Sequence, residues 1–339
     1  MTDFEVSRRA VLAGMAALPL TAGLARAAGM GGVKQFDPAL ADVIDVNAEI
    51  EVIASGYKWA EGPVWVRKGG YLLFSDVPAN INYQWKKGAA PTVFMNPSGL
   101  AGPIPAGVRE AGSNGMAVDV LGRLIMADSG TRCVAAVDLK TKKKTILADK
   151  YDGKRFNSCN DVALHGNGTI YFTDPPYGLS DGDTSSLKEL DFNGVFRLDP
   201  QGQVQLIAND LSRPNGVGVS PDQQTLYVSM SDEKRPHILA YPLDIEGGVS
   251  DYPKVFADFS AELAQKLPGL PDGLKVSRTG HLFASGPGGI YILSSEGKKL
   301  GLISTGKAIA NCCFGEDGKT LFLTSSDMIA KVPLKISGW

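Results

Sequence analysis

The chain has 339 residues and a formal net charge of −2, so it has no basic excess of the kind that binds nucleic acid. Hydrophobic residues make up 44% and charged residues 21%, which is typical of a globular protein with an apolar core. The 40 glycines and 20 prolines predict many turns and argue against a helical protein.

The first 27 residues have the features of an export signal. A twin arginine, Arg8-Arg9, precedes an apolar stretch over 10–24, and an A-x-A cleavage motif spans 25–27. Paired arginines are typical of the signal that carries folded proteins across a bacterial inner membrane. A membrane anchor is the alternative, but the apolar stretch is short and rich in Ala and Gly. We predict a twin-arginine signal peptide over 1–27, a periplasmic location, and no membrane contact after cleavage.

An N-terminal extension is predicted over 28–47, and a short strand over 48–56 (AEIEVIASG) follows it. Six copies of one pattern then fill the chain. Each copy has a polar residue, a short apolar strand, a turn with Gly or Asp, and a second strand that ends near Ser, Thr or Asp. The copies begin at Glu61, Asn114, Asn160, Asn215, Asp272 and Asn311.

Strand repeats that recur every 39 to 57 residues predict a propeller, and six copies predict six blades. Residues 48–339 therefore form one all-β domain, a six-bladed β-propeller. The strand over 48–56 is expected to be the outer strand of the last blade, which closes the ring and removes exposed sheet edges. The only helical pattern is short and spans 260–267 (SAELAQKL).

The polar residues that open the six copies are expected to form a ring, because the first strand of each blade lines the axis. Two carboxylates, Glu61 and Asp272, and several amide oxygens would meet there, a donor set that suits a hard divalent cation such as calcium. The alternative is that these are turns, since Asn-Gly and Asp-Gly are turn signals. Glycine is missing after Asn160 and Asn311 while the polar residue remains, so the ring is favoured.

Other motifs are weak. The sequence GLSDG (178–182) matches a nucleophile elbow, but no helical pattern follows it. The histidines lack metal-binding spacing. The four cysteines contain no C-x-x-C motif and are expected to be buried core residues, with a Cys133–Cys159 disulfide as the alternative.

Four blocks of sequence resemble, in order, the family of senescence marker protein, gluconolactonase and luciferin-regenerating enzyme. The blocks are AEGPVW (60–65), RFNSCNDVALHGNGTIYFTDPPYG (155–178), RPNGVGVSPDQQTLYVS (213–229) and LPDGLKVSRTGHLFAS (270–285). The resemblance implies a six-bladed propeller that holds one divalent cation at its axis and hydrolyses sugar lactones. Calcium is the first choice of cation, with zinc, manganese, magnesium or iron as alternatives.

The resemblance also implies roles for individual residues. Glu61, Asn215 and Asp272 match the metal ligands, and Asn160 matches a position that faces substrate and can also bind the metal. Asn114 and Arg155 are further candidates for substrate contact. The block after Asn114 departs from the family pattern at Asp128, Ser129 and Thr131, which leaves the identity of the lactone open.

We therefore predict a gluconolactonase-like enzyme in which a cation-activated water opens a sugar lactone, with Asp272 as the catalytic base. Metal-bound hydroxide or Glu61 is the alternative base. Two other functions are compatible with the fold: a phosphotriesterase-type metal hydrolase and a binding propeller without catalysis. The two carboxylates of the ring favour an enzyme. A monomer or a small homo-oligomer is expected.

Overall fold

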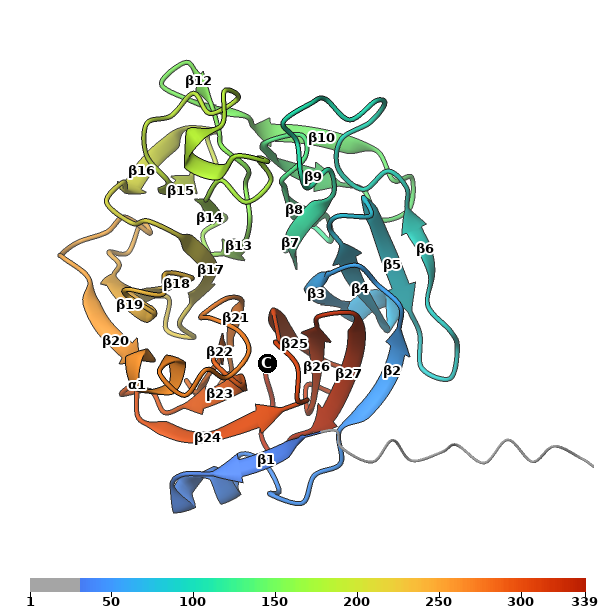
Figure 1. The fold of residues 1–339 in the computed structure, drawn as a ribbon, viewed down its shortest axis with the longest axis vertical. Helices are drawn as coiled ribbons and strands as arrows, with labels where there is room; N and C mark the ends of the chain where they lie inside the picture. Colours follow the sequence, from blue (N-terminus) through green and yellow to red (C-terminus); the bar gives the residue numbers. More distant parts are fainter. Residues whose placement is uncertain (1–30) are drawn as a thin grey trace, which may run out of the picture.

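The computed structural model describes residues 31–339 of the chain. Six antiparallel sheets stand around a central axis like the blades of a propeller (Figure 1). This arrangement confirms the predicted all-β, six-bladed fold. The predicted signal over 1–27 lies outside the described residues. Within 31–339, no helix is long and apolar enough to cross a membrane.

The strands of each blade follow one another from the axis outward. Blade 1 contains β3 (Ala60–Val66), β4 (Tyr71–Asp76), β5 (Ile81–Trp85) and β6 (Thr92–Met95), and blade 2 contains β7 (Ser113–Val118), β8 (Leu124–Asp128), β9 (Cys133–Val137) and β10 (Lys144–Ala148). Blade 3 contains β13 (Val162–Leu164), β14 (Ile170–Asp174), β15 (Gly194–Leu198) and β16 (Val204–Ala208), and blade 4 contains β17 (Pro214–Val219), β18 (Thr225–Met230), β19 (His237–Pro242) and β20 (Lys254–Asp258). Blade 5 contains β21 (Leu274–Val276), β22 (Leu282–Gly286), β23 (Gly289–Leu293) and β24 (Lys299–Ser304).

Blade 6 joins the two ends of the described chain. Its inner strands are β25 (Asn311–Gly315), β26 (Thr320–Ser325) and β27 (Met328–Pro333), and its outer strand is β2 (Glu51–Ser55). The expectation that the segment 48–56 closes the ring is thereby confirmed. A separate hairpin, β11 (Lys150–Tyr151) and β12 (Lys154–Arg155), lies between blades 2 and 3 in the chain.

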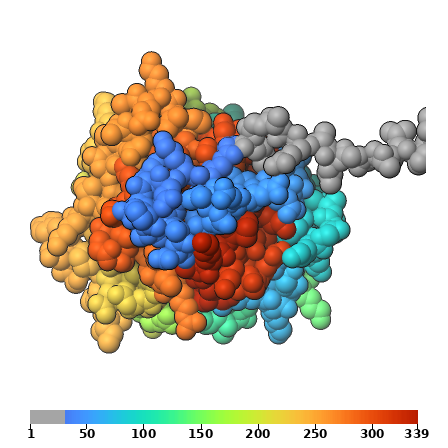
Figure 2. All heavy atoms as spheres, turned by 90° about the horizontal axis from the view of Figure 1, so that it is seen from below, coloured from blue at the N-terminus to red at the C-terminus, as the bar shows by residue number. Residues whose placement is uncertain are grey.

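Residues 31–47, which the sequence places outside the propeller, pack on blades 5 and 6. The strand β1 (Gly32–Gln35) pairs with β24 and becomes a fifth strand of blade 5. A 3₁₀ turn over Pro38–Asp42 follows, and Leu40 and Ile44 enter the apolar layer between blades 5 and 6. Figure 2 shows this segment lying across the last two blades. The extension is thus a strap over the junction where the ring closes.

The helix over 260–267 is shorter than predicted. The structure contains only α1 (Ser260–Leu263), one turn long. Lys266 has a left-handed φ of 56° and Pro268 follows, and both features stop a helix.

The apolar core consists of six layers within the described residues, one between each pair of neighbouring blades. Successive residues of a strand face opposite layers: Leu72 packs toward blade 6 and Leu73 toward blade 2. Both faces of each blade are buried in this way. Cys133 and Cys159 lie in different layers, and all four cysteines are buried and free, so the alternative disulfide is absent.

Candidate active site at the propeller axis

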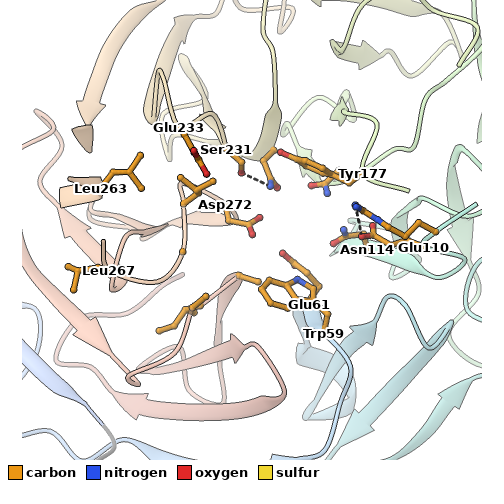
Figure 3. Close-up of a pocket in the computed structure, with 18 residues that line it drawn as sticks. Trp59, Glu61, Glu110, Asn114, Tyr177, Ser231, Glu233, Leu263, Leu267 and Asp272 are labelled. Atoms are coloured by element: carbon orange, nitrogen blue, oxygen red, sulfur yellow. Dashed lines mark hydrogen bonds and ion pairs between the residues drawn. The ribbon is translucent and has the colours of Figure 1, made fainter. Parts of the chain in front are cut away.

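A cavity of about 580 Å³ opens at one end of the axis (Figure 3). Five of the six residues that open the sequence repeats line it: Glu61, Asn114, Asn160, Asn215 and Asp272. Three of them lie on inner strands, whereas Asn160 and Asp272 lie just before β13 and β21. The structure therefore brings together residues that are up to about 200 positions apart in sequence, as the ring interpretation expects.

The inner strands bulge where these residues occur. Strand pairing skips between Glu61 and Val64 in β3, and the same irregularity is found in β7 and β17. A bulge turns a side chain away from the regular alternation of a strand and re-aims it. The polar side chains can therefore face the axis while the rest of each strand packs against neighbouring blades.

The glycines after the polar residues serve close approach between blades rather than turns. A Cβ at Gly115 would lie 2.0 Å from Oδ1 of Asp161, and a Cβ at Gly273 would lie 1.9 Å from Cγ of Asn311. In both cases the contact is with a residue of the next blade around the axis. The Asn-Gly and Asp-Gly pairs are thus a consequence of crowding at the axis, which decides between the two interpretations of the pattern.

Asn311, the sixth residue, is buried and does not line the cavity. Its Nδ2 donates a hydrogen bond to Oε2 of Glu61 at 3.1 Å, and its Oδ1 accepts from the backbone N–H of Cys312 at 2.9 Å. Its amide therefore orients the Glu61 carboxylate from below.

A third carboxylate, that of Asp161, lies near Glu61 and Asn311 at the axis and is buried. Its Oδ1 accepts from the N–H of Val162 at 2.9 Å, and its Oδ2 lies 4.0 Å from Nζ of Lys275. The ring predicted from the sequence does not include Asp161 or Lys275, because both stand one or more positions past the residue that opens their repeat. Their position at the axis is a product of the fold.

Burial and mutual repulsion raise the pKa values of these acids. Removal from water, followed by the charge of Asp161, raises the pKa of Glu61 to about 7. Removal from water, followed by the charges of Glu61 and Asp161, raises the pKa of Asp272 well above its ordinary value. Neither Glu61 nor Asp272 forms an ion pair with another described residue. Three carboxylates and the single Lys275 ammonium leave a formal charge of −2 when all are ionised.

The side chains around Asp272 are held by hydrogen bonds from blade 4. Ser231 donates its hydroxyl to the carbonyl of Pro271, and it accepts from Nδ2 of Asn215 at 2.8 Å. Because the Asn215 Nδ2 is engaged in this hydrogen bond, the Asn215 Oδ1 is the atom left to coordinate a cation.

The donor set fits a hard dication. The carboxylates of Glu61 and Asp272 and the amide groups of Asn160 and Asn215 surround one cavity floor. Together with the nearby Asp161 and Lys275, these groups carry a formal charge of −2, which matches one divalent ion. Among residues 31–339 no group of three His, Cys, Asp or Glu side chains has metal-binding geometry, so a soft or zinc-type site built of such ligands is absent there. Any cation at this axis would be held by the carboxylates of Glu61 and Asp272 together with amide oxygens and water.

Arg155 is placed away from the cavity. It lies in β12, its Nη2 donates to the carbonyl of Thr131 at 2.7 Å, and it is not among the residues that line the cavity. The cavity instead has Arg109, which the sequence did not indicate. The hairpin β11–β12 holds Arg155 toward Glu189, whose Oε2 accepts from its backbone N–H at 2.8 Å.

Two long loops form one wall of the cavity. Residues 96–112 precede β7 and residues 175–193 precede β15, and the two loops pair through a bridge between Val108 and Leu179. The N–H of Arg109 also donates to the carbonyl of Gly178 at 2.7 Å. This pairing places Arg109, Glu110 and Tyr177 on the cavity wall.

The groups on this wall are polar, and Glu110 and the Tyr177 hydroxyl are poorly solvated, whereas the Arg109 side chain is 54% exposed. Nη2 of Arg109 lies 3.2 Å from Oε1 of Glu110, and burial raises the pKa of Glu110 to about 7 against the opposing effect of Arg109. The Tyr177 hydroxyl is buried without a hydrogen-bond partner among the described residues. The sequence indicates neither Tyr177 nor Glu110 as a site residue, because no repeated pattern marks either one.

Comparisons with known proteins agree with this geometry. A family model described as "SMP-30/Gluconolactonase/LRE-like region" matches residues 59–327. The chain is 48% identical to a gluconolactonase of Zymomonas mobilis subsp. mobilis, over all of both chains. The solved structure of XC5397, a gluconolactonase from Xanthomonas campestris, is 31% identical, with a TM-score of 0.77 that covers 90% of this chain and 95% of that one. Regucalcin, a calcium-binding protein from Agrobacterium tumefaciens, shares the fold at 18% identity, with a TM-score of 0.68 over 86% of this chain and 96% of that one.

Proposed function

This chain belongs to the SMP-30/gluconolactonase/LRE-like family, and we propose on that basis that it is an enzyme that hydrolyses lactones. The full-length relationship to a gluconolactonase supports this reaction. The structural observation that carries the proposal is the meeting of Glu61 and Asp272 at the floor of a cavity that can hold a ring substrate. The substrate in this proposal is a small sugar lactone.

We further propose that Glu61, Asn160, Asn215 and Asp272 hold one divalent cation, with calcium preferred. The oxygen donors and the formal charge of −2 support a hard ion. When bound, such an ion polarises a carbonyl group and lowers the pKa of a water molecule.

The chain's own residues then have distinct tasks. Asp272 accepts the proton of the attacking water and returns it to the ring oxygen that is released when the acyl C–O bond breaks. The products are a carboxylic acid and an alcohol on one open chain. Asn311 holds the Glu61 carboxylate in place, and Asn114 and Asn160 face the substrate with amide groups. Arg109, paired with Glu110, takes the place predicted for Arg155 and is positioned to contact substrate hydroxyls.

A substrate panel tests the proposed reaction. Gluconolactone, a pentonolactone and a phosphotriester would each be incubated with the protein, with and without a chelator, and acid release would be compared with the spontaneous rate. We expect turnover of the sugar lactones that chelator abolishes. Hydrolysis of the phosphotriester alone would contradict the lactonase assignment, and unchanged turnover in chelator would contradict the need for a metal.

Export to the periplasm is also proposed, from the Arg8-Arg9 pair and the cleavage motif at 25–27. N-terminal sequencing of protein from a bacterial host that has the twin-arginine pathway should begin near Ala28. Recovery of only intact protein from the cytoplasm would contradict export.

A further inference from the structure

The wall of the cavity opposite the charged pair is largely apolar, with Glu233 as a charged residue that also lines the cavity on the side of Leu263 (Figure 3). Leu263 of α1, together with Leu267 and Leu270 after it, lines the cavity on this side, and we call these three residues the leucine wall. Figure 3 shows Leu263 and Leu267 on one side of Asp272, with Tyr177 and Glu110 on the other. Ile309 and two flanking alanines continue this apolar surface at the start of blade 6.

The leucine wall is held in position by the rest of the protein. Nζ of Lys299 lies 2.5 Å from Oε1 of Glu262 and donates to the carbonyl of Asp258 at 2.7 Å. The N–H of Gly288 donates to the carbonyl of Pro268 at 2.7 Å. These bonds fix both ends of the segment, so its leucines are presented to the cavity by a framework and not by a free loop.

A sugar lactone alone does not account for this wall. Leu267 and Trp59 both line the cavity, and each is 36% exposed. Covering such apolar side chains is favourable, so a ligand that packs on them would gain binding free energy. The cavity of about 580 Å³ is within the range of roughly 300–1,000 Å³ that suits drug-sized ligands. A single hydroxylated ring bound at the carboxylates would leave water against the leucines.

We propose, on the premise that the protein is a lactonase, that its preferred substrate is a sugar lactone that carries an apolar substituent, and that this substituent packs on the leucine wall. The reacting ester is fixed by the carboxylates at the cavity floor, and the hydroxyl or ring oxygens face Arg109 and Glu110. A chain attached to the ring then extends toward Leu263 and Leu267. The occupant of the wall is therefore part of the substrate and has alkyl character.

A chain-length series tests this inference. δ-Lactones with no substituent and with alkyl chains of increasing length at the carbon beside the ring oxygen would be compared by kcat and KM. We expect KM to fall by about fourfold for each of the first few methylene groups, because each buried methylene contributes transfer free energy, while kcat changes little. Leu263→Ser and Leu267→Ser should each flatten this dependence. Ile245→Ser is the matched control, because Ile245 is 93% exposed and lies outside the cavity.

Binding of lactams separates this inference from the proposed reaction. A lactam with the same alkyl chains resists hydrolysis, so its Kd can be measured by calorimetry without turnover. A Kd that falls with chain length in the wild type, and not in Leu267→Ser, supports the leucine wall even if no lactone is opened. A KM and Kd independent of chain length, with normal turnover of gluconolactone, would overturn the inference and leave the lactonase intact. Stronger binding of a disaccharide lactone than of an alkyl lactone would overturn it as well.

Discussion

At the scale of single residues, the site depends on acids that the fold keeps from water. Glu61 and Asp161 are buried, Asp272 faces the cavity, and among residues 31–339 only Lys275 offers a positive charge beside them. A nearby dication would favour their charged forms, and its absence favours protonation. The chemistry of each acid is therefore set by its neighbours rather than by its own type.

Asp272→Asn tests the role of the proposed base. The amide keeps the shape of the side chain and one oxygen, but it cannot accept the water proton. We expect turnover to fall by about 10²–10⁴ and excess metal not to restore it. Metal titration followed by kcat at saturation is the measurement, with the exposed loop variant Asp251→Asn as control. Near-wild-type turnover at saturating metal would move the proton acceptor to Glu61 or to the water itself.

Glu110→Gln tests the wall of the cavity. Burial raises the pKa of Glu110 to about 7 in the folded chain from an ordinary value of 4.5, so folding favours its protonated form. The stability that this group contributes is present below about pH 4.5 and is lost as pH rises through 7. Urea unfolding should show Glu110→Gln more stable than wild type by up to about 3 kcal/mol at pH 8, with little difference at pH 4.5. An equal difference at both pH values would show that Glu110 does not titrate in this range.

At the scale of strands and loops, the inner strands meet so closely that side chains are excluded at some positions. Gly115 contacts Asp161 and Gly273 contacts Asn311 of the next blade. At the outside of the propeller, by contrast, side chains are added: the strap over 31–47 contributes apolar side chains to the layer where the ring closes. Each region gives a separate prediction.

Gly115→Ala should disturb the axis. Its Cβ would lie 2.0 Å from the Asp161 carboxylate and 2.6 Å from the Asp161 Cα, so backbone as well as side chain must move. We expect a loss of about 1–3 kcal/mol in the free energy of unfolding and weaker metal binding. Gly32→Ala is the control, since no atom lies within 4 Å of its added Cβ. Equal stability of the two variants would contradict the close approach.

Leu40→Ala tests the strap. Leu40 is fully buried against the layer between blades 5 and 6, so its truncation leaves a cavity. The expected loss in the free energy of unfolding is about 2–5 kcal/mol. Phe36→Ala, in the same segment but 43% exposed, should cost far less. If both variants unfold like the wild type, the segment does not support the propeller.

At the scale of the whole molecule, the fold encloses its axial acids with six apolar layers and tolerates their repulsion. An ion that binds only the folded chain would offset this repulsion and stabilise the propeller by mass action. Metal binding and global stability are therefore expected to be coupled.

Metal removal tests this coupling. Thermal unfolding would be followed in chelator and then with calcium, zinc, manganese or magnesium added in steps. At a free concentration of 100 times Kd the stabilisation should be about 2.7 kcal/mol, and Tm should rise with the logarithm of metal concentration. The ion that acts at the lowest concentration identifies the preferred metal. A Tm that no ion changes would contradict a cation site at the axis.

Much of this architecture can be predicted from the sequence, because the local signals and the global fold agree. The apolar strands, the turns and the spacing of Glu61, Asn114, Asn160, Asn215, Asp272 and Asn311 repeat with the blades, so repetition in sequence becomes rotation about one axis. A periodic signal of this kind predicts the number of blades, the ring of polar residues and the closing strand β2.

Only the tertiary structure decided the rest. Asn311 lies below the cavity while its five counterparts line it. Asp161 and Lys275 add their charges to those at the axis. Arg109 lines the cavity, whereas Arg155 lies away from it. The leucine wall lies on α1 and the segment after it, and the charged pair lies on the loop before β7; neither belongs to the repeat. The position of the charged pair depends on pairing between two loops about 70 residues apart, and such long-range contacts leave no local pattern in the chain.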